Sequence, residues 1–180
     1  VADSAKVYDG EVYSGGHGYE IQEEIDGDLI FYGGTSQGAV DAGTYDLTIY
    51  SVQQGYDLID NRSAKLTVQP RELTLSNFAA DNKTYDGTID VTGDDFDDDR
   101  VEGDELTFSY DVAFEDENAG IDKDVLFTNI TLDGEDAGNY TLTAESGTAQ
   151  ADIDPKPITI IPDNDQSKVY GTDDPEFTFT

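Results

Sequence analysis

The stretch that decides the fold class is Leu106-Thr107-Phe108-Ser109-Tyr110-Asp111-Val112-Ala113-Phe114. Its large apolar side chains recur at every second residue, and the residues between them are small or polar. A period of two is typical of a β-strand with one buried face, because successive side chains of a strand point to opposite faces. The stretch therefore predicts a long strand that borders a hydrophobic core.

The same alternation continues in shorter stretches on both sides. It occurs at Tyr45, Leu47 and Ile49, at Leu66 and Val68, and at Leu73 and Leu75. No stretch shows the capped apolar stripe of an amphipathic helix. Thr, Tyr and the Asp-Gly pairs favour strands joined by tight turns. We therefore expect an all-β protein.

A break in the alternation predicts a bulge. Val125 and Phe127 are out of phase with Ile130 and Leu132, so that one residue too many stands near Thr128-Asn129. An extra residue in one strand of a pair is the definition of a β-bulge.

Three short motifs recur along the chain and divide it into units. The first motif occurs as Lys6-Val7-Tyr8-Asp9-Gly10, Lys83-Thr84-Tyr85-Asp86-Gly87 and Lys168-Val169-Tyr170-Gly171. The second occurs as Asp41-Ala42-Gly43-Thr44-Tyr45-Asp46-Leu47-Thr48 and Asp136-Ala137-Gly138-Asn139-Tyr140-Thr141-Leu142-Thr143. The third occurs as Val68-Gln69-Pro70-Arg71-Glu72-Leu73-Thr74 and Ile153-Asp154-Pro155-Lys156-Pro157-Ile158-Thr159.

The spacing of these motifs sets the boundaries. Pro70 precedes Lys83 by 13 residues, and Pro155 precedes Lys168 by 13 residues. We therefore predict a first unit at 1–70, a second unit at 71–155 and the truncated start of a third unit at 156–180. Proline fixes φ and holds its predecessor in an extended conformation, so Pro70 and Pro155 predict a nearly straight passage between units.

The second motif also indicates how each unit folds. In immunoglobulin-like sandwiches a Tyr at the start of strand F bonds back to the backbone a few residues upstream, and an inward residue follows two positions later. Tyr45 with Leu47 and Tyr140 with Leu142 have this layout, and two strand-like stretches follow each Tyr. We predict tandem immunoglobulin-like β-sandwiches, with β-grasp-like sheets as the alternative.

Composition excludes several classes of function. The 41 acidic and 9 basic residues leave a net charge of −32, which repels nucleic acids and anionic membrane surfaces. There is no cysteine, which excludes disulfides, zinc fingers and thiol nucleophiles. No apolar stretch approaches the roughly 18 residues that a membrane span needs, so we expect no membrane insertion. The chain begins at Val1 without a leader and ends inside an apparent strand at 176–180, which suggests an excerpt or a processed product.

The three motifs together resemble the YDG and MBG repeat families of bacterial surface proteins. The resemblance implies tandem modules of a very large secreted adhesin, located outside the cell at the bacterial surface. It implies a structural role, with neighbouring modules of the same chain as partners, and it names no ligand. The first unit departs from the pattern, because Gly15-Gly16-His17-Gly18 and Leu29-Ile30-Phe31-Tyr32 replace the long alternating strand.

The densest acidic cluster predicts a cation site. Asp95, Asp97, Asp99, Glu102 and Asp104 lie within one short segment, and Ca²⁺ takes six to eight oxygen ligands. An EF-hand is excluded, because Arg100 stands where its glycine is required and Leu106 where its bidentate glutamate is required. Two interpretations remain, an irregular Ca²⁺ site and a solvated acidic loop.

Candidate residues for a binding surface are few. Tyr13, Tyr19, Tyr32 and Tyr56 of the first unit are the candidates for a glycan face, whereas Tyr8, Tyr85 and Tyr170 are expected to pack at strand ends. His17 is the only histidine and no triad spacing surrounds it, so we expect no enzyme.

Three functions follow from these observations. The first is a non-catalytic stalk segment of a surface adhesin. The second is a module that binds a glycan or a host protein. The third is a self-associating fibre subunit, in which the strand expected at 176–180 pairs with another chain.

Overall fold

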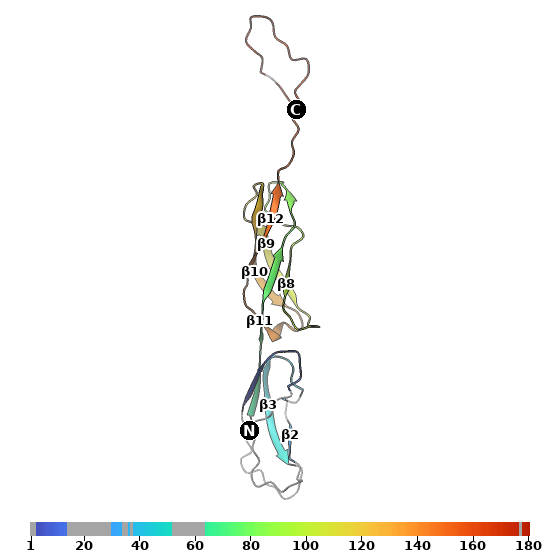
Figure 1. Ribbon diagram of the computed structural model, residues 1–180, viewed down its shortest axis with the longest axis vertical. Helices are drawn as coiled ribbons and strands as arrows, with labels where there is room; N and C mark the ends of the chain where they lie inside the picture. The colour runs from blue at the N-terminus through green and yellow to red at the C-terminus, as the bar shows by residue number, and fades with distance from the viewer. Residues whose placement is uncertain (1–2, 14–29, 34–35, 37, 52–63, 177) are drawn as a thin grey trace.

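The computed structural model describes residues 3–13, 30–33, 36, 38–51, 64–176 and 178–180. Over these residues the protein is all-β, and the one helical element is a 3-10 turn at Ala137–Asn139. Figure 1 shows two β units stacked end to end along the long axis, with the residues after 155 leading away from the far end. The prediction of an all-β chain is confirmed.

The described residues of the first unit form one four-stranded sheet in the order β1-β4-β3-β2. Its strands are β1 (Ser4–Val7), β2 (Ile30–Gly33), β3 (Gly43–Ser51) and β4 (Ala64–Gln69). β1 pairs with β4 in parallel, and the other two pairs are antiparallel. In β4 the alternate residues Ala64, Leu66 and Val68 are buried, as the period of two predicted.

The second unit repeats this sheet and adds a second layer. The sheet has the order β7-β12-β10-β9, and the second layer is the pair β6-β8. The strands are β6 (Leu75–Ala79), β7 (Lys83–Thr84), β8 (Asp95–Asp98), β9 (Thr107–Phe114), β10 (Gly120–Asp133) and β12 (Gly147–Asp154). β7, which leads into the second Tyr-Asp-Gly turn, pairs in parallel with β12, the last strand of the unit in chain order. β1 and β4 have the same relation in the first unit.

The core of the second unit lies between its two layers. Phe127 of β10 is fully buried, and Phe78 of β6 and Phe96 of β8 meet it with ring centroids 5.0 Å and 6.2 Å away. Gly147 of β12 leaves room for the ring of Phe78, because a Cβ there would lie 2.2 Å from Cζ. The layers are therefore held by aromatic packing.

The predicted bulge is present in β10. The register between β10 and β9 shifts between Thr128 and Thr131, and Asn129 has a φ of 55°. The shift keeps Phe127 and Ile130 both buried although they are three residues apart.

Pro70 alone separates the two units along the chain. β4 ends at Gln69, and β5 (Arg71–Leu73) begins directly after Pro70. β5 then pairs in parallel with β11 (Tyr140–Leu142) of the second unit. The chain is therefore extended on both sides of Pro70, as the proline predicted.

Residues 156–180 differ from the prediction. The described residues of this segment form no strand, and their one pairing is an antiparallel bridge between Pro162 and Phe179. The predicted strand at 176–180 is therefore wrong. The described side chains of the segment are exposed, so that no packed face supports a longer ladder. No helix in the described part of the chain is long and apolar enough to cross a membrane.

Candidate functional site

The first Tyr-Asp-Gly turn lies at the end of the first unit that faces the second. The N–H of Tyr8 donates to the carbonyl of Gln69 at 2.9 Å, which continues the parallel pairing of β1 and β4. Lys6 Nζ donates to Asp9 Oδ1 and to the carbonyl of Glu11, each at 2.6 Å. Gly10 completes the turn with a φ of 77°, a conformation that glycine adopts without a Cβ penalty. The lysine and the aspartate of the motif thus fix the turn that presents the tyrosine.

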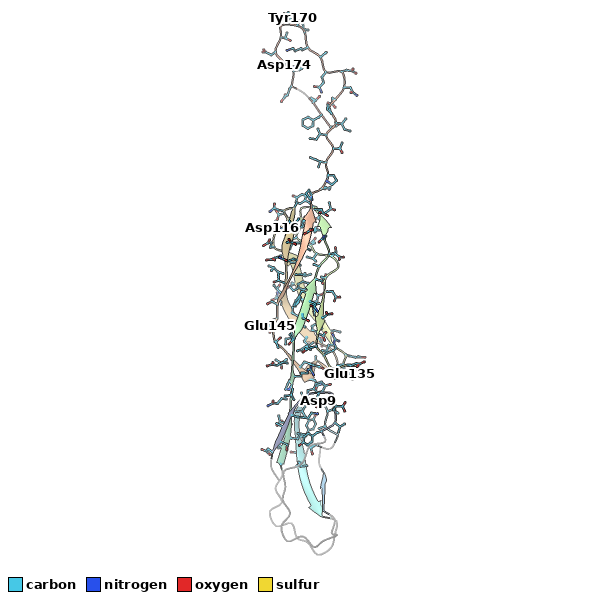
Figure 2. The ribbon with its side chains drawn as sticks, in the orientation of Figure 1. Asp9, Asp116, Glu135, Glu145, Tyr170 and Asp174 are labelled. Carbon is cyan, nitrogen blue, oxygen red and sulfur yellow. The ribbon has the colours of Figure 1, made fainter. Side chains whose placement is uncertain are left out.

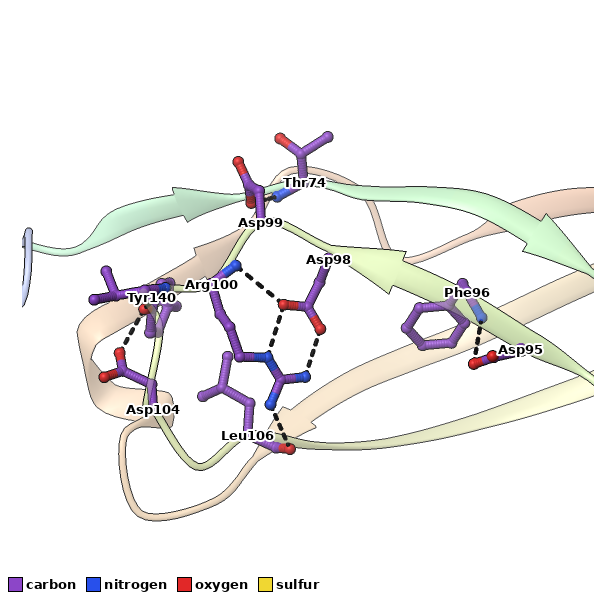
Figure 3. Close-up of polar contacts among 10 residues, drawn as sticks. Thr74, Asp95, Phe96, Asp98, Asp99, Arg100, Asp104, Leu106 and Tyr140 are labelled. Atoms are coloured by element: carbon purple, nitrogen blue, oxygen red, sulfur yellow. Dashed lines mark hydrogen bonds and ion pairs between the residues drawn. The ribbon is translucent and has the colours of Figure 1, made fainter.

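The side chain of Tyr8 is buried against the second unit. Its exposed fraction is 4%, and its ring meets that of Tyr140 edge to face with centroids 5.5 Å apart. Its hydroxyl donates to Asp104 Oδ2 at 2.9 Å. The hydroxyl of Tyr140 donates to the same oxygen at 2.5 Å, as Figure 3 shows. One carboxylate of the second unit therefore binds a tyrosine from each unit.

The hydroxyl of Tyr140 is also an acceptor. The N–H of Val101 donates to it at 2.8 Å, so both functions of this hydroxyl are used. A polar group that is removed from water is costly unless it is hydrogen-bonded, and this network satisfies each hydroxyl.

Apolar residues of both units surround the two rings in one continuous cluster. The first unit contributes Tyr8, Ala39, Leu66 and Val68, and the second contributes Leu73, Leu106 and Tyr140. Leu73 is completely buried. Gly10 and Val101 touch so closely that a Cβ on Gly10 would lie 2.8 Å from Val101 Cγ1. We call this cluster, with Asp104 and Val101, the junction.

A second polar bridge crosses the junction at Asn139. This side chain is 4% exposed. Its Oδ1 accepts from the N–H of Ala42 at 2.7 Å, and its Nδ2 donates to Asp41 Oδ1 at 3.3 Å. The two units are therefore joined by directional contacts at two separate points.

The junction raises the pKa of both tyrosines. Burial, and then the hydrogen bond to Asp104, hold the pKa of Tyr8 well above its usual range. The same two causes, in the same order, raise the pKa of Tyr140 to about 12. Both hydroxyls are therefore protonated at neutral pH and available as donors.

The two copies of the second sequence motif do not have the same place in the fold. Tyr45 lies in β3, which pairs antiparallel with β4, and its hydroxyl donates to the carbonyl of Asp41 at 2.8 Å. The predicted bond from the tyrosine hydroxyl to the upstream backbone is present there. Tyr140 instead begins β11, which pairs in parallel with β5, and its hydroxyl binds Asp104. For Tyr140 the predicted bond to the upstream backbone is wrong, and the counterpart of β3 is β10, which precedes Tyr140 in the chain.

The acidic residues of the predicted Ca²⁺ site are not brought together. Asp97 accepts from Asn77, and Asp99 accepts from the N–H of Thr74. Asp95 accepts from the N–H of Phe96, whereas Asp104 lies in the junction. Asp95 and Asp97 lie on the same exposed face of β8, two residues apart along the strand, and each binds a different partner. Within the described ranges, which include Glu102, no three acidic or histidine side chains form a group that could hold a metal ion.

The nearest basic residue reinforces this picture. Arg100 binds both oxygens of Asp98, at 2.8 Å and 2.5 Å, and donates to the carbonyl of Leu106 (Figure 3). This pairing is the main reason why the pKa of Asp98 is lowered. Arg100, which breaks the EF-hand pattern in the sequence, thus binds the acidic segment at Asp98 and at the carbonyl of Leu106.

The predicted surface tyrosines have different outcomes. Tyr8 packs its ring and uses its hydroxyl, as predicted, whereas Tyr85 is 39% exposed and Tyr170 is fully exposed. Tyr13 is half-buried and packs against the junction, and its N–H donates to the carbonyl of Ala39. His17, Tyr19 and Tyr56 lie outside the described residues, and so does the side chain of Tyr32.

The sequence of the second unit matches one protein-family model. Residues 69–149 match the YDG domain. The YDG match includes Leu73, Val101, Asp104, Leu106 and Tyr140, which are the second unit's part of the junction. The first unit lies outside the YDG match except for Gln69 and Pro70. Comparison with curated proteins gave no match, and comparison with solved structures gave none.

Sequence reasoning missed the roles of Asp104 and Asn139. Asp104 was assigned to the acidic cluster, because nothing local distinguishes it from its neighbours. Its partner Tyr8 is 96 residues away in the chain, and no spacing rule connects the two.

Proposed function

We propose that this chain is a non-catalytic stalk segment of a secreted bacterial surface adhesin, which projects a distant binding region away from the cell. The observation that carries the proposal is the buried junction, where Tyr8 of one unit and Tyr140 of the next share Asp104. A flexible linker would leave both tyrosines in water. A packed and hydrogen-bonded contact restricts the angle between units, and a projecting rod needs that restriction.

The end-to-end arrangement supports the same function. The passage at Pro70 needs only one residue between strands, and each unit adds its length to the long axis (Figure 1). The YDG match supports a repeat module, and the Lys-x-Tyr-Asp-Gly motif at both turns supports a tandem array.

We further propose that each unit is a reduced immunoglobulin-like sandwich. Both sheets have an edge strand parallel to the last strand, followed by antiparallel neighbours, which is the order of the A′, G, F and C strands of that fold. The bond from Tyr45 to Asp41 supports the assignment of β3 as strand F.

Location and role are tested in the organism that makes the protein. Antibodies against the second unit are expected to label intact cells, and deletion of residues 71–155 in frame is expected to leave the protein on the surface with a shorter projection. Electron microscopy of antibody-labelled cells measures both. Labelling confined to permeabilised cells would exclude the surface location, and an unchanged projection would exclude the stalk.

A further inference from the structure

The second Tyr-Asp-Gly turn is built like the first. Tyr85 N–H donates to the carbonyl of Asp154, as Tyr8 N–H donates to that of Gln69. Lys83 pairs with Asp86 at 2.8 Å, as Lys6 pairs with Asp9. Gly87 has a φ of 79°, against 77° for Gly10. The two turns therefore present their tyrosines in the same local conformation.

The two turns differ in what covers them. Tyr8 is 4% exposed beneath the second unit, whereas Tyr85 is 39% exposed. In the part of the chain that the structure describes, the hydroxyl of Tyr85 makes no hydrogen bond. The residue three positions after each junction proline shows the same contrast, since Leu73 is completely buried and Ile158 is 80% exposed.

We infer that the Tyr85 turn and Ile158 form a docking surface for a third unit that offers an aspartate carboxylate and a tyrosine, as the second unit offers Asp104 and Tyr140 to Tyr8. The occupant is a unit of the same kind, because the second unit is what covers the equivalent turn at Tyr8. The chain also leads there, since residues 153–159 repeat the segment 68–74 that carries the chain into the second unit.

The geometry of the occupied junction specifies the partner's face. It needs an acceptor within hydrogen-bonding distance of the Tyr85 hydroxyl, an aromatic edge against its ring, and an apolar side chain against Gly87, where Val101 meets Gly10. That position beside Gly87 is open in the structure, because the Tyr85 hydroxyl, at 4.0 Å, would be the nearest contact of a Cβ there. The inference deepens the proposed stalk function and rests on it.

The test inserts a second copy of residues 71–155 after Pro155 of the full chain. Tyr85→Phe is then made in the first copy, and also in the parent chain, which is residues 1–180 without the insertion. We expect Tyr85→Phe to leave the thermal midpoint of the parent chain unchanged and to lower that of the extended chain by about 4 °C or more, because only there does the hydroxyl have a carboxylate partner. Asp104→Asn in the inserted copy is expected to remove most of this difference.

Tyr8→Phe in both chains serves as the matched control. If Tyr8→Phe lowers the midpoint and Tyr85→Phe has no effect in the extended chain, the docking surface is excluded while the stalk proposal stands. If Tyr8→Phe is also without effect, the junction itself does not couple the units and the stalk proposal fails. Sedimentation of the parent chain is expected to show a monomer. A dimer that Tyr85→Phe abolishes would assign the surface to a second chain and overturn the inference.

Discussion

Asp104 is the residue on which the contact between the units depends most directly. Its Oδ2 accepts from Tyr8 of one unit and Tyr140 of the other, so that its charge is compensated by two neutral donors. Hydrogen bonds to a charged group are worth about 1.5–3 kcal/mol each, roughly twice as much as those between neutral groups. The sequence places Asp104 among many acids, and only the fold distinguishes it.

The two turn glycines provide a matched pair of substitutions. Gly10→Ala and Gly87→Ala both place a side chain at positive φ, which costs about 1–2 kcal/mol. Gly10→Ala additionally brings Cβ to 2.8 Å from Val101 across the junction, whereas Gly87→Ala meets nothing closer than 4.0 Å. We expect Gly10→Ala to lower the free energy of unfolding by about 1–3 kcal/mol more than Gly87→Ala does. Urea unfolding followed by circular dichroism measures both, and equal losses would contradict the close contact.

The tyrosines make the junction sensitive to alkaline pH. A group whose pKa is raised on folding contributes stability that is complete below its unfolded pKa, about 10 for tyrosine, and is lost as pH rises through the folded value. Because the pKa of Tyr8 and Tyr140 is raised, to about 12 for Tyr140, the free energy of unfolding should fall between about pH 10 and pH 12.

Urea titrations at a series of pH values measure this fall. The double variant Tyr8→Phe, Tyr140→Phe is expected to start from a lower stability and to lose less of it over the same range. Tyr110, whose pKa the hydrogen bond to Asp94 raises to about 12, remains in that variant and accounts for part of the residual slope. A slope identical to that of the parent chain would exclude the two junction tyrosines as its source.

The alternation of apolar and polar residues predicted the positions of the strands better than the similarity between motifs predicted how the strands pair. The period of two located the strands around Leu106–Phe114 and Leu66–Val68, and its interruption located the bulge at Asn129, because burial of one face is a local property of a strand. The similar segments at Tyr45 and Tyr140 predicted the same place in the fold for both tyrosines, and this was wrong because the partner of a strand depends on distant residues. β3 pairs with β4, whereas β11 pairs with β5.

The bulge is testable through Asn129. Its φ of 55° is tolerated by glycine and asparagine and strained for a β-branched side chain. We expect Asn129→Gly to change the free energy of unfolding by less than about 1 kcal/mol, and Asn129→Val to lower it by about 2 kcal/mol. Chemical denaturation of the two variants measures the difference. Similar stabilities would show that the register of β10 does not depend on this residue.

For the whole molecule the dominant property is the net charge of −32. Asp97, Asp99, Asp98 and Asp104 are engaged separately, with Asn77, Thr74, Arg100 and the two junction tyrosines. The described residues offer no common cation position. Added salt should therefore stabilise by screening, which acts over about 10 Å at 0.1 M ionic strength. We expect NaCl and CaCl₂ at matched ionic strength to raise the thermal midpoint equally. A rise specific to Ca²⁺ that Asp97→Asn and Asp99→Asn remove would restore the cation site predicted from the sequence.

The acids are distributed along the whole rod. Figure 2 shows Asp9 where the two units meet, Asp116 near the far end of the second unit, and Asp174 beyond it. Like charges spread along an axis repel one another least when the axis is straight. The charge therefore favours the same extended form as the junction does.

The parallel pairing of β1 with β4, and of β7 with β12, determines how the chain carries tension. A pull on the two ends of the molecule draws β1 one way and β4 the other, along their common direction, so that their ladder bonds are loaded together and not one after another. Such a shear geometry resists rupture better than a hairpin that is peeled open at one end. The register of β1 with β4 has four residues, and that of β7 with β12 has two.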